Sequence, residues 1–351
     1  MWTTYLIIAV LLLAAELIYF RIADKCNIID KPNERSSHST IVLRGGGVIF
    51  AISMICWLIL QMVNGEWFTV QGYLPFMVGL VLICGVSFWD DVKSLPDSVR
   101  LVTQFLSMGL AAWGMILDSG LMVLEWYWLV AIMIAALIVF VGATNIINFM
   151  DGINGITAGY SLAVLIPLVM VNGEGFTVNG AGFIAPSYLI VAIIGVLVFC
   201  IFNFRPKGKA KCFAGDVGSI GIAFIMLFAI GKLIVQTGDV TYLILLLVYG
   251  VDGCLTIVHR IMLHENLGEA HRKHAYQLMA NELKIGHVKV TLLYMAMQLA
   301  VSLGFIYLIP CTVAAHWMYF VGAILVLTVA YVLFKKKYYH LHEEYLASLK
   351  Q

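Results

Sequence analysis

Charged residues are scarce in this sequence. Asp, Glu, Lys and Arg make up 12% of its 351 residues, and 62% of the chain is hydrophobic. An average soluble domain has roughly 25% charged residues, so a water-soluble core does not fit this composition. The formal net charge is only +1. A nucleic-acid-binding face needs a much larger clustered basic excess, so we expect no nucleic-acid partner.

Paired cysteines, internal repeats and linkers are also missing. The seven cysteines are scattered and form no C-x-x-C pair, which argues against a disulfide framework and a zinc site. No Pro/Ser-rich segment separates a second domain. We therefore expect one membrane domain over residues 1–334, with its active site in the loops on one side, followed by a basic tail at residues 335–351.

Long apolar segments are what the chain does contain. A helix that crosses the hydrocarbon needs about 20 apolar residues. Windows of this kind predict an all-α, polytopic transmembrane helical bundle of about 11 spans. They lie near residues 2–20, 45–63, 72–89, 99–117, 125–144, 156–171, 183–202, 217–236, 240–259, 288–308 and 316–334.

The cationic residues fall on alternate loops. Segments 21–44, 90–100, 203–215, 260–290 and 335–351 hold 20 of the 21 Lys and Arg residues. The positive-inside rule then predicts that these loops and the C-terminus are cytosolic and that the N-terminus lies outside. Topology alone explains most of this positive charge.

An acidic pair follows the third apolar segment, in DDVKSLPD. Asp90 and Asp91 are adjacent carboxylates, which repel each other unless a cation or a metal–phosphate group lies between them. Lys93 can neutralise them or hold a phosphate. The alternative is a solvated helix end.

A polar stripe ends the fifth apolar segment, in NIINFMDGINGI. Asn145, Asn148, Asp151 and Asn154 recur every three residues, which places them on one helical face. Polar groups at this depth usually serve a site or line water. An Asn ladder joining two helices is the alternative.

Two further clusters lie in later loops. Asp216 stands between glycines where a helix begins, a position that attracts anions but also suits a simple N-cap. His271 and His274 are three residues apart with Arg272 between them. A third zinc ligand is missing, so phosphate binding is the better functional interpretation, and a plain surface helix remains open. Asp252 is an intramembrane carboxylate without an evident partner.

Together these groups favour magnesium-assisted transfer of a phosphorylated group at a membrane surface. Magnesium takes hard oxygen ligands in small number and completes its shell with substrate phosphates. Phosphoryl transfer depends mainly on positioning and charge neutralisation. The location at the membrane boundary indicates that one substrate is a lipid.

Five short segments occur in the order typical of a known family. RGGG at Arg44 is followed by DDVKSLPD, NIINFMDGING, FAGDVGS and HRKHAYQ. With them the sequence resembles the polyprenyl-phosphate N-acetylhexosamine-1-phosphate transferases over most of its length. The resemblance implies a UDP-activated amino sugar and undecaprenyl phosphate as substrates, Mg2+ (or Mn2+) as cofactor, and UMP as a product. It also implies a bacterial cytoplasmic membrane protein whose active site faces the cytosol.

The resemblance also implies residue roles. Asp90 and Asp91 would be the acidic pair near the lipid phosphate, and Asp216 the metal ligand. Asp151 would be catalytic in the same cleft. The expected substrate-binding residues are Lys93, Asn145, Asn148, Asn154, Asn203, His271, Arg272 and His274.

Two departures narrow the expectation. Many members read DGxDG, whereas the second acid is here Asn154, so a metal role at that position is doubtful. HRKHAYQ differs from the triple-histidine motif of the peptidoglycan enzyme and is closer to the branch that starts O-antigen and capsule synthesis. The expected sugar is N-acetylglucosamine or a 6-deoxy relative. A UDP-MurNAc-pentapeptide transferase, a lipid or sugar transporter and a membrane scaffold are the alternatives, and a homodimer is compatible with the sequence.

Overall fold

The computed structural model describes residues 2–30, 41–119, 121–173, 182–268 and 271–348. Parts of the predicted loops 21–44 and 260–290 and the last residues of the tail lie outside these ranges. The α-helices are α1 (Trp2–Lys25), α2 (Val48–Val63), α3 (Trp67–Val92), α4 (Asp97–Asp118), α5 (Trp126–Phe149), α6 (Ile156–Gly173), α7 (Pro186–Asn203), α8 (Gly215–Thr237), α9 (Leu247–Met262), α10 (Ala275–Gln277), α11 (His287–Leu303) and α12 (Val313–Ser348). Shorter 3-10 turns are η1 (Leu121–Val123) and η2 (Val240–Leu246), and π-helical turns are η3 (Leu278–Glu282) and η4 (Gly304–Leu308).

The predicted helical membrane bundle is confirmed. In the described ranges, ten helical segments are long and apolar enough to cross a membrane, and α2 is an apolar helix of 16 residues. Each of the eleven predicted windows coincides with a helix. The last helix extends beyond its window, because α12 continues without a break to Ser348. Residues 335–348, expected as part of a tail, are thus a continuation of that helix.

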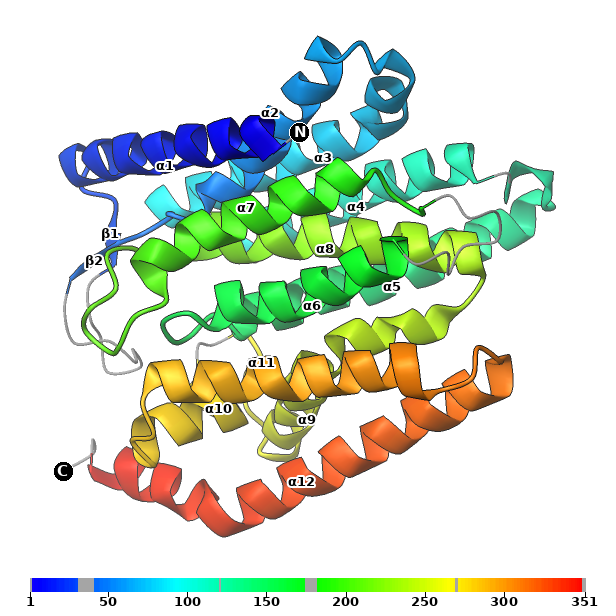
Figure 1. Ribbon diagram of the computed structural model, residues 1–351. Coiled ribbons are helices and arrows are strands. Elements are labelled where there is room, and N and C mark those ends of the chain that lie inside the picture. Colours follow the sequence, from blue (N-terminus) through cyan, green and yellow to red (C-terminus); the bar gives the residue numbers. More distant parts are fainter. Residues whose placement is uncertain (1, 31–40, 120, 174–181, 269–270, 349–351) are drawn as a thin grey trace.

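Helix α8 occupies the centre of the bundle (Figure 1). It packs against α2, α3, α4, α5 and α6, and nearly all of its side chains are buried. On one face Phe224 and Phe228 stack on Phe76 of α3. On another, a Cβ on Gly47 would lie 2.2 Å from the Cα of Gly218, so glycine lets the start of α2 approach α8 closely. This contact fixes the position of the first turn of α8.

A small β-structure covers one end of the bundle. Strands β1 (Ile29–Asp30) and β2 (Val42–Leu43) pair antiparallel. Figure 1 shows them at the same end as the loop that follows α7. The Phe213 N–H of that loop donates to the Leu43 carbonyl at 2.8 Å, and the Gly46 N–H donates to the Phe213 carbonyl at 2.9 Å. These bonds bring the RGGG segment beside the segment that precedes α8.

Candidate active site

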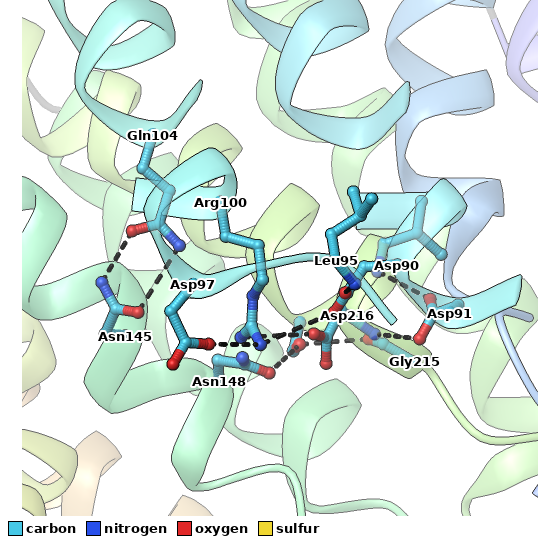
Figure 2. A network of polar contacts seen from close by, with 12 residues as sticks. Asp90, Asp91, Leu95, Asp97, Arg100, Gln104, Asn145, Asn148, Gly215 and Asp216 are labelled. Carbon is cyan, nitrogen blue, oxygen red and sulfur yellow. Dashed lines mark hydrogen bonds and ion pairs between the residues drawn. The ribbon is translucent and has the colours of Figure 1, made fainter. Parts of the chain in front are cut away.

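The first turn of α8 is held by a carboxylate from α3 (Figure 2). Asp91 accepts hydrogen bonds from the backbone N–H groups of Asp216 at 2.9 Å and Val217 at 3.0 Å. Its side chain is fully buried, and Arg44 Nε lies 2.7 Å from its Oδ1. Gly215 has a φ of +70°, and a Cβ there would lie 2.4 Å from the Asp91 carboxylate. Asp91 therefore fills the anion position at a helix N-terminus, which a free carboxylate or phosphate would otherwise prefer.

The neighbouring acid, Asp90, points into a different set of contacts. Its Oδ1 accepts the Leu95 N–H at 2.6 Å, which closes the turn between α3 and α4. Its Oδ2 lies 3.6 Å from Arg100 Nη1 on α4. The two adjacent carboxylates avoid repulsion because each faces its own guanidinium group.

Asp216 lies between these same two arginines. Its Oδ1 is 3.8 Å from Arg44 Nη2, and its Oδ2 is 3.4 Å from Arg100 Nη2. Charge-assisted bonds are typically 2.7–2.9 Å long, so these pairs are loose. About a sixth of the Asp216 side chain is exposed. The carboxylate can thus accept a further cation, and the arginines can accept an anion.

The end of α5 contributes its polar stripe, as the spacing predicted. Asn145 exchanges hydrogen bonds with Gln104 of α4, and Asn148 Oδ1 accepts from Ser219 Oγ of α8 at 2.7 Å. Figure 2 shows both amides beside the arginine and aspartate cluster. The stripe therefore joins helices, as its alternative proposed, and also borders the cluster.

Asp151 follows α5 at the mouth of the site. It accepts a hydrogen bond from Thr157 Oγ1 at 2.5 Å. Burial raises the pKa of Asp151 to about 6, although the Thr157 bond acts in the opposite direction. A pKa of about 6 is close to neutrality, so protonation of this carboxyl group at neutral pH costs little free energy.

Two amides that the sequence predicts to bind substrate make hydrogen bonds to neighbouring loops. Asn154 Nδ2 donates to the carbonyls of Arg205 at 3.0 Å and Pro206 at 2.9 Å. Asn203 accepts the Gly155 N–H at 2.7 Å and donates to the Cys212 carbonyl at 2.8 Å. Both residues still line a cavity, but their polar atoms position the loop between α7 and α8.

The residues of the histidine motif point to two different places. The rings of His271 and His274 are tilted by 33° to each other with centroids 5.0 Å apart, and both residues line a cavity. Arg272 instead lies 3.8 Å from Glu282 and over the ring of Tyr345, and it lines neither cavity near the acidic cluster. Lys93 is exposed at the C-terminal end of α3 and also lines neither of them. The structure therefore brings the two histidines, but not Arg272 or Lys93, to the cluster.

Two cavities adjoin the cluster and meet at Asp151, Gly152 and Gln277. The first measures about 280 Å³ and is bordered by the α8 start and the loops. The second measures about 440 Å³ and lies between α4, α5 and the histidine motif. The first is lined by Asp30, Arg44, Asn148, Asp151, Gly152, Ile153, Asn154, Asn203, Phe213, Gly215, Asp216, Gln277 and His287. The second is lined by Asp97, Arg100, Leu101, Gln104, Asn145, Phe149, Asp151, Gly152, Arg260, Leu267, Gly268, His271, His274 and Gln277.

Several lining residues were not predicted as site residues. The sequence marks Arg44 only as part of the RGGG motif, and it does not distinguish Arg100, Gln104 or Gln277. Arg100 was visible as the only Arg in the cationic loop 90–100. Gln104 gave no signal of its own, because its role depends on pairing with α5 in space.

The oxygen donors at the first cavity suit a hard cation. The carboxylates of Asp216 and Asp151 and the amide of Asn148 all line it. Among the described residues no three His, Cys, Asp or Glu side chains cluster as a complete metal site. Magnesium does not require one, because it is commonly held by one or two carboxylates together with water and substrate phosphates. The donor set therefore fits Mg2+ bound together with a substrate.

Fold and site together define a polytopic helical membrane protein with a charged, phosphate-compatible site at one end of its bundle. Residues 73–235 match the family model described as glycosyl transferase family 4, in agreement with the resemblance that the motifs carry. This match covers α3 to α8, which carry Asp90, Asp151 and Asp216.

Curated relatives span a larger part of the chain. A Bacillus subtilis protein described as a probable undecaprenyl-phosphate N-acetylglucosaminyl 1-phosphate transferase is 27% identical over 74% of this chain and 72% of its own. The phospho-N-acetylmuramoyl-pentapeptide-transferase of Thermotoga maritima is 27% identical over 62% of this chain and 67% of its own. The decaprenyl-phosphate N-acetylglucosaminephosphotransferase of Mycobacterium leprae is 25% identical over 76% of this chain and 72% of its own.

Proposed function

We propose that this protein transfers an N-acetylhexosamine 1-phosphate from a UDP-sugar to undecaprenyl phosphate and releases UMP. N-acetylglucosamine or a 6-deoxy relative is the proposed sugar. The relatives from Bacillus subtilis and Mycobacterium leprae support this, since both are described as N-acetylglucosamine phosphate transferases that act on a polyprenyl phosphate. We also propose that the product starts a lipid-linked cell-surface polysaccharide.

The observation that carries the proposal is the arrangement around Asp216. This carboxylate stands between two loosely paired guanidinium groups, from Arg44 and Arg100. Arg44 lines the first cavity and Arg100 the second, and the two cavities share Asp151. A reaction between two phosphate-bearing substrates needs two adjoining anion sites with a charged group between them.

In the proposed reaction, an oxygen of the lipid phosphate attacks the sugar-linked phosphorus of the UDP-sugar. A new phosphorus–oxygen bond forms, the bond to the UMP phosphate breaks, and UMP leaves with that electron pair. A phosphate monoester has its second pKa near 6, so most of the lipid phosphate is already a dianion at pH 7. The chain then has to orient the nucleophile more than deprotonate it, and Asp90 and Arg100 are the groups proposed to do so.

We propose Mg2+ as the cofactor, with Mn2+ as a substitute. Asp216 would hold it, with the Asp151 carboxylate at the same cavity. When bound, the ion supplies positive charge that neutralises the pyrophosphate of the donor. The residues of the chain supply the rest: Arg44 and Arg100 attract the phosphates, and Asp91 keeps the Asp216 backbone in place.

We further propose that the site faces the cytosol of a bacterial inner membrane. The described parts of the cationic segments and the site residues lie at one end of the bundle (Figure 1), and the positive-inside rule assigns such loops to the cytosol. A UDP-sugar would be available on that side. A transporter is less consistent with the fold, because transporter sites usually lie near the bilayer midplane. A membrane scaffold would not require two cavities lined with polar side chains.

A second candidate substrate is UDP-MurNAc-pentapeptide. The relative from Thermotoga maritima is described as a phospho-N-acetylmuramoyl-pentapeptide-transferase, and this likeness supports the second candidate. Selectivity between amino sugars can depend on contacts worth about 1–3 kcal/mol. Purified protein assayed with undecaprenyl phosphate and a panel of UDP-sugars, including UDP-MurNAc-pentapeptide, would identify the donor.

The decisive test is release of UMP from UDP-N-acetylglucosamine. We expect release to require both undecaprenyl phosphate and Mg2+, and the Asp216→Asn variant to lose it. Release that is independent of lipid would contradict the transferase proposal. Capture of a phosphosugar on the protein in the absence of lipid would replace single displacement by a covalent aspartyl route.

A further inference from the structure

Helix α12 is longer than a membrane span requires. About 20 residues cross the hydrocarbon layer, whereas α12 has 36. Its part from Lys335 onward therefore extends beyond that layer, at the end of the bundle that carries the candidate active site (Figure 1). The buried side chains of α12 are His316, near its other end, and Lys335 and His342 in this extension. Lys335 and His342 are at i and i+7, so they share one helical face.

Lys335 holds the backbone of the histidine motif. Its side chain is 8% exposed, and its ammonium group donates a hydrogen bond to the Lys273 carbonyl. The ring centroids of Tyr331 and Tyr339 lie 5.6 and 4.7 Å from the same nitrogen. A buried ammonium group is costly unless it is paired, so the carbonyl and the two rings favour a cation at this position. The residue after the held carbonyl is His274, which lines the second cavity.

His342 holds the other end of the same segment. Its Nδ1 lies 3.0 Å from Glu282 Oε1, and the two side chains are 2% and 5% exposed. Glu282 is the last residue of η3, which follows α10 directly. Three residues further along α12, the Tyr345 ring centroid lies 4.7 Å from the guanidinium carbon of Arg272. Contacts from the α12 extension thus hold both ends of the segment from Arg272 to Glu282.

This segment carries two residues of the candidate active site. His274 and Gln277 both line the second cavity, and Gln277 also lines the first. The segment contains only the three-residue helix α10 and the π-helical turn η3. Helices this short are not stable by themselves, so the position of the segment depends on what packs against it. Asp252 of α9 accepts the Ala275 N–H at 3.0 Å, and the contacts at the two ends come from α12.

We propose that residues 335–348 of α12 form a clamp that keeps His274 and Gln277 at the second cavity, with Lys335 as its principal positioning residue. The reaction in which the clamp takes part rests on the proposed function. Lys335 lies outside the lining of the second cavity. It therefore acts through the backbone of the histidine motif, by the bond to the carbonyl that precedes His274.

Three consecutive lysines of α12 provide the test, because Lys335 is buried whereas Lys336 and Lys337 are exposed. Lys335→Met keeps the length of the side chain but removes its charge and its donor. In the full-length protein in lipid nanodiscs, we expect kcat/KM for sugar-phosphate transfer to undecaprenyl phosphate to fall about tenfold. Lys336→Met and Lys337→Met remove the same charge from the same helix and should stay within about twofold of the wild type. An equal fall in all three variants would overturn the clamp.

Amide hydrogen exchange tests the clamp without an assay of activity. In Lys335→Met, the amides of residues 271–283 should exchange about tenfold faster than in the wild type, while those of α8 keep the wild-type rate. In Lys336→Met both regions should exchange as in the wild type. Slower transfer with unchanged exchange in residues 271–283 would overturn the clamp and leave the proposed function intact. A wild-type protein that transfers no sugar phosphate would contradict the proposed function, and the exchange difference would still test the clamp.

A conservative variant separates positioning from a general loss of stability. Lys335→Arg keeps a cation that can donate to the Lys273 carbonyl and stack on the two tyrosine rings. We expect it to restore both the transfer rate and the slow exchange of residues 271–283 to within about threefold of the wild type. If Lys335→Met accelerates exchange throughout the bundle, and Lys335→Arg restores the exchange rates but not transfer, Lys335 has a structural role only and the clamp is contradicted.

Discussion

The Asp91 carboxylate accepts the backbone N–H of Asp216 at 2.9 Å, although the two residues are 125 positions apart. Through this bond, Asp91 of the DDVKSLPD motif holds the backbone of Asp216 in the FAGDVGS motif. Asp91 uses both oxygens on the first turn of α8 and on Arg44, so it has little capacity left for a substrate. Asp216, in contrast, directs its carboxylate outward between two arginines.

Asp91→Ala should therefore destabilise the protein. It leaves two buried N–H groups and one guanidinium without their partner, and each such group costs about 1–3 kcal/mol. We expect a fall of several degrees in the thermal unfolding midpoint in detergent. Asp91→Asn should cost less, because one oxygen acceptor remains. Asp97→Ala is the control: Asp97 is 85% exposed in its side chain and should unfold like the wild type.

Arg44 and Arg100 should differ when they are neutralised. Arg44 Nε is 2.7 Å from buried Asp91, whereas the contacts of Arg100 to Asp90 and Asp216 are 3.6 and 3.4 Å. Arg44→Gln should thus reduce both stability and transfer rate. Arg100→Gln should raise KM for a phosphate substrate about tenfold while the unfolding midpoint stays close to wild type. An equal loss of stability in both variants would contradict this distinction.

Removal of divalent metal tests the role proposed for Asp216. Excess EDTA should abolish UMP release, and added Mg2+ or Mn2+ should restore it. Asp216→Glu should retain activity but need more metal for half-maximal rate, because the longer side chain keeps the charge but alters the geometry. Restoration of Asp216→Asn to wild-type rate by extra Mg2+ would argue that another residue holds the ion.

Asn154 stands where many members of the resembled family have the second acid of DGxDG, and its contacts explain why an amide fits there. Its amide nitrogen donates to two carbonyls of the loop after α7, a role that a carboxylate cannot fill. Asn154→Asp should therefore place negative charge against two carbonyl oxygens and loosen that loop. We expect a lower unfolding midpoint and faster tryptic cleavage near Lys207 and Lys209. Any effect of Asn203→Asp should instead come from the loss of its hydrogen bond to the Cys212 carbonyl and the change at its bond from the Gly155 N–H. Unchanged cleavage would mean that the loop is held by other contacts.

The sequence predicted the membrane bundle, but it did not predict which contacts its polar residues make. Apolar windows locate spans because every backbone polar group in lipid must be satisfied within a helix. Motif spacing placed Asn145, Asn148 and Asp151 on one face, and they do border the cluster. Spacing cannot show which acid turns inward, so the different contacts of Asp90 and Asp91 required the three-dimensional structure.

Asp252 also shows that the sequence does not reveal which residues pair in space. Its depth in an apolar helix marked it as a buried carboxylate, but its partner His274 lies 22 residues further along the chain. Arg272 stands two positions before His274, yet it turns to Glu282. Side-chain direction in a short, irregular segment depends on packing against α9, α11 and α12, which no local pattern encodes.

The pH dependence of stability should reveal Asp151. Burial raises its pKa in the folded protein from 3.8 to about 6, so between these values the folded state binds a proton that the unfolded state has released. Stability contributed by this group is therefore present below pH 3.8 and is lost as the pH rises through 6. Asp151→Asn should raise the unfolding midpoint at pH 7.5 and raise it much less at pH 4.5. The same variant should lose transfer activity at both pH values, since the carboxylate lies where the two cavities meet. A midpoint that does not rise at pH 7.5 would mean that the ionised carboxylate is compensated within the fold, for example by the Thr157 hydroxyl.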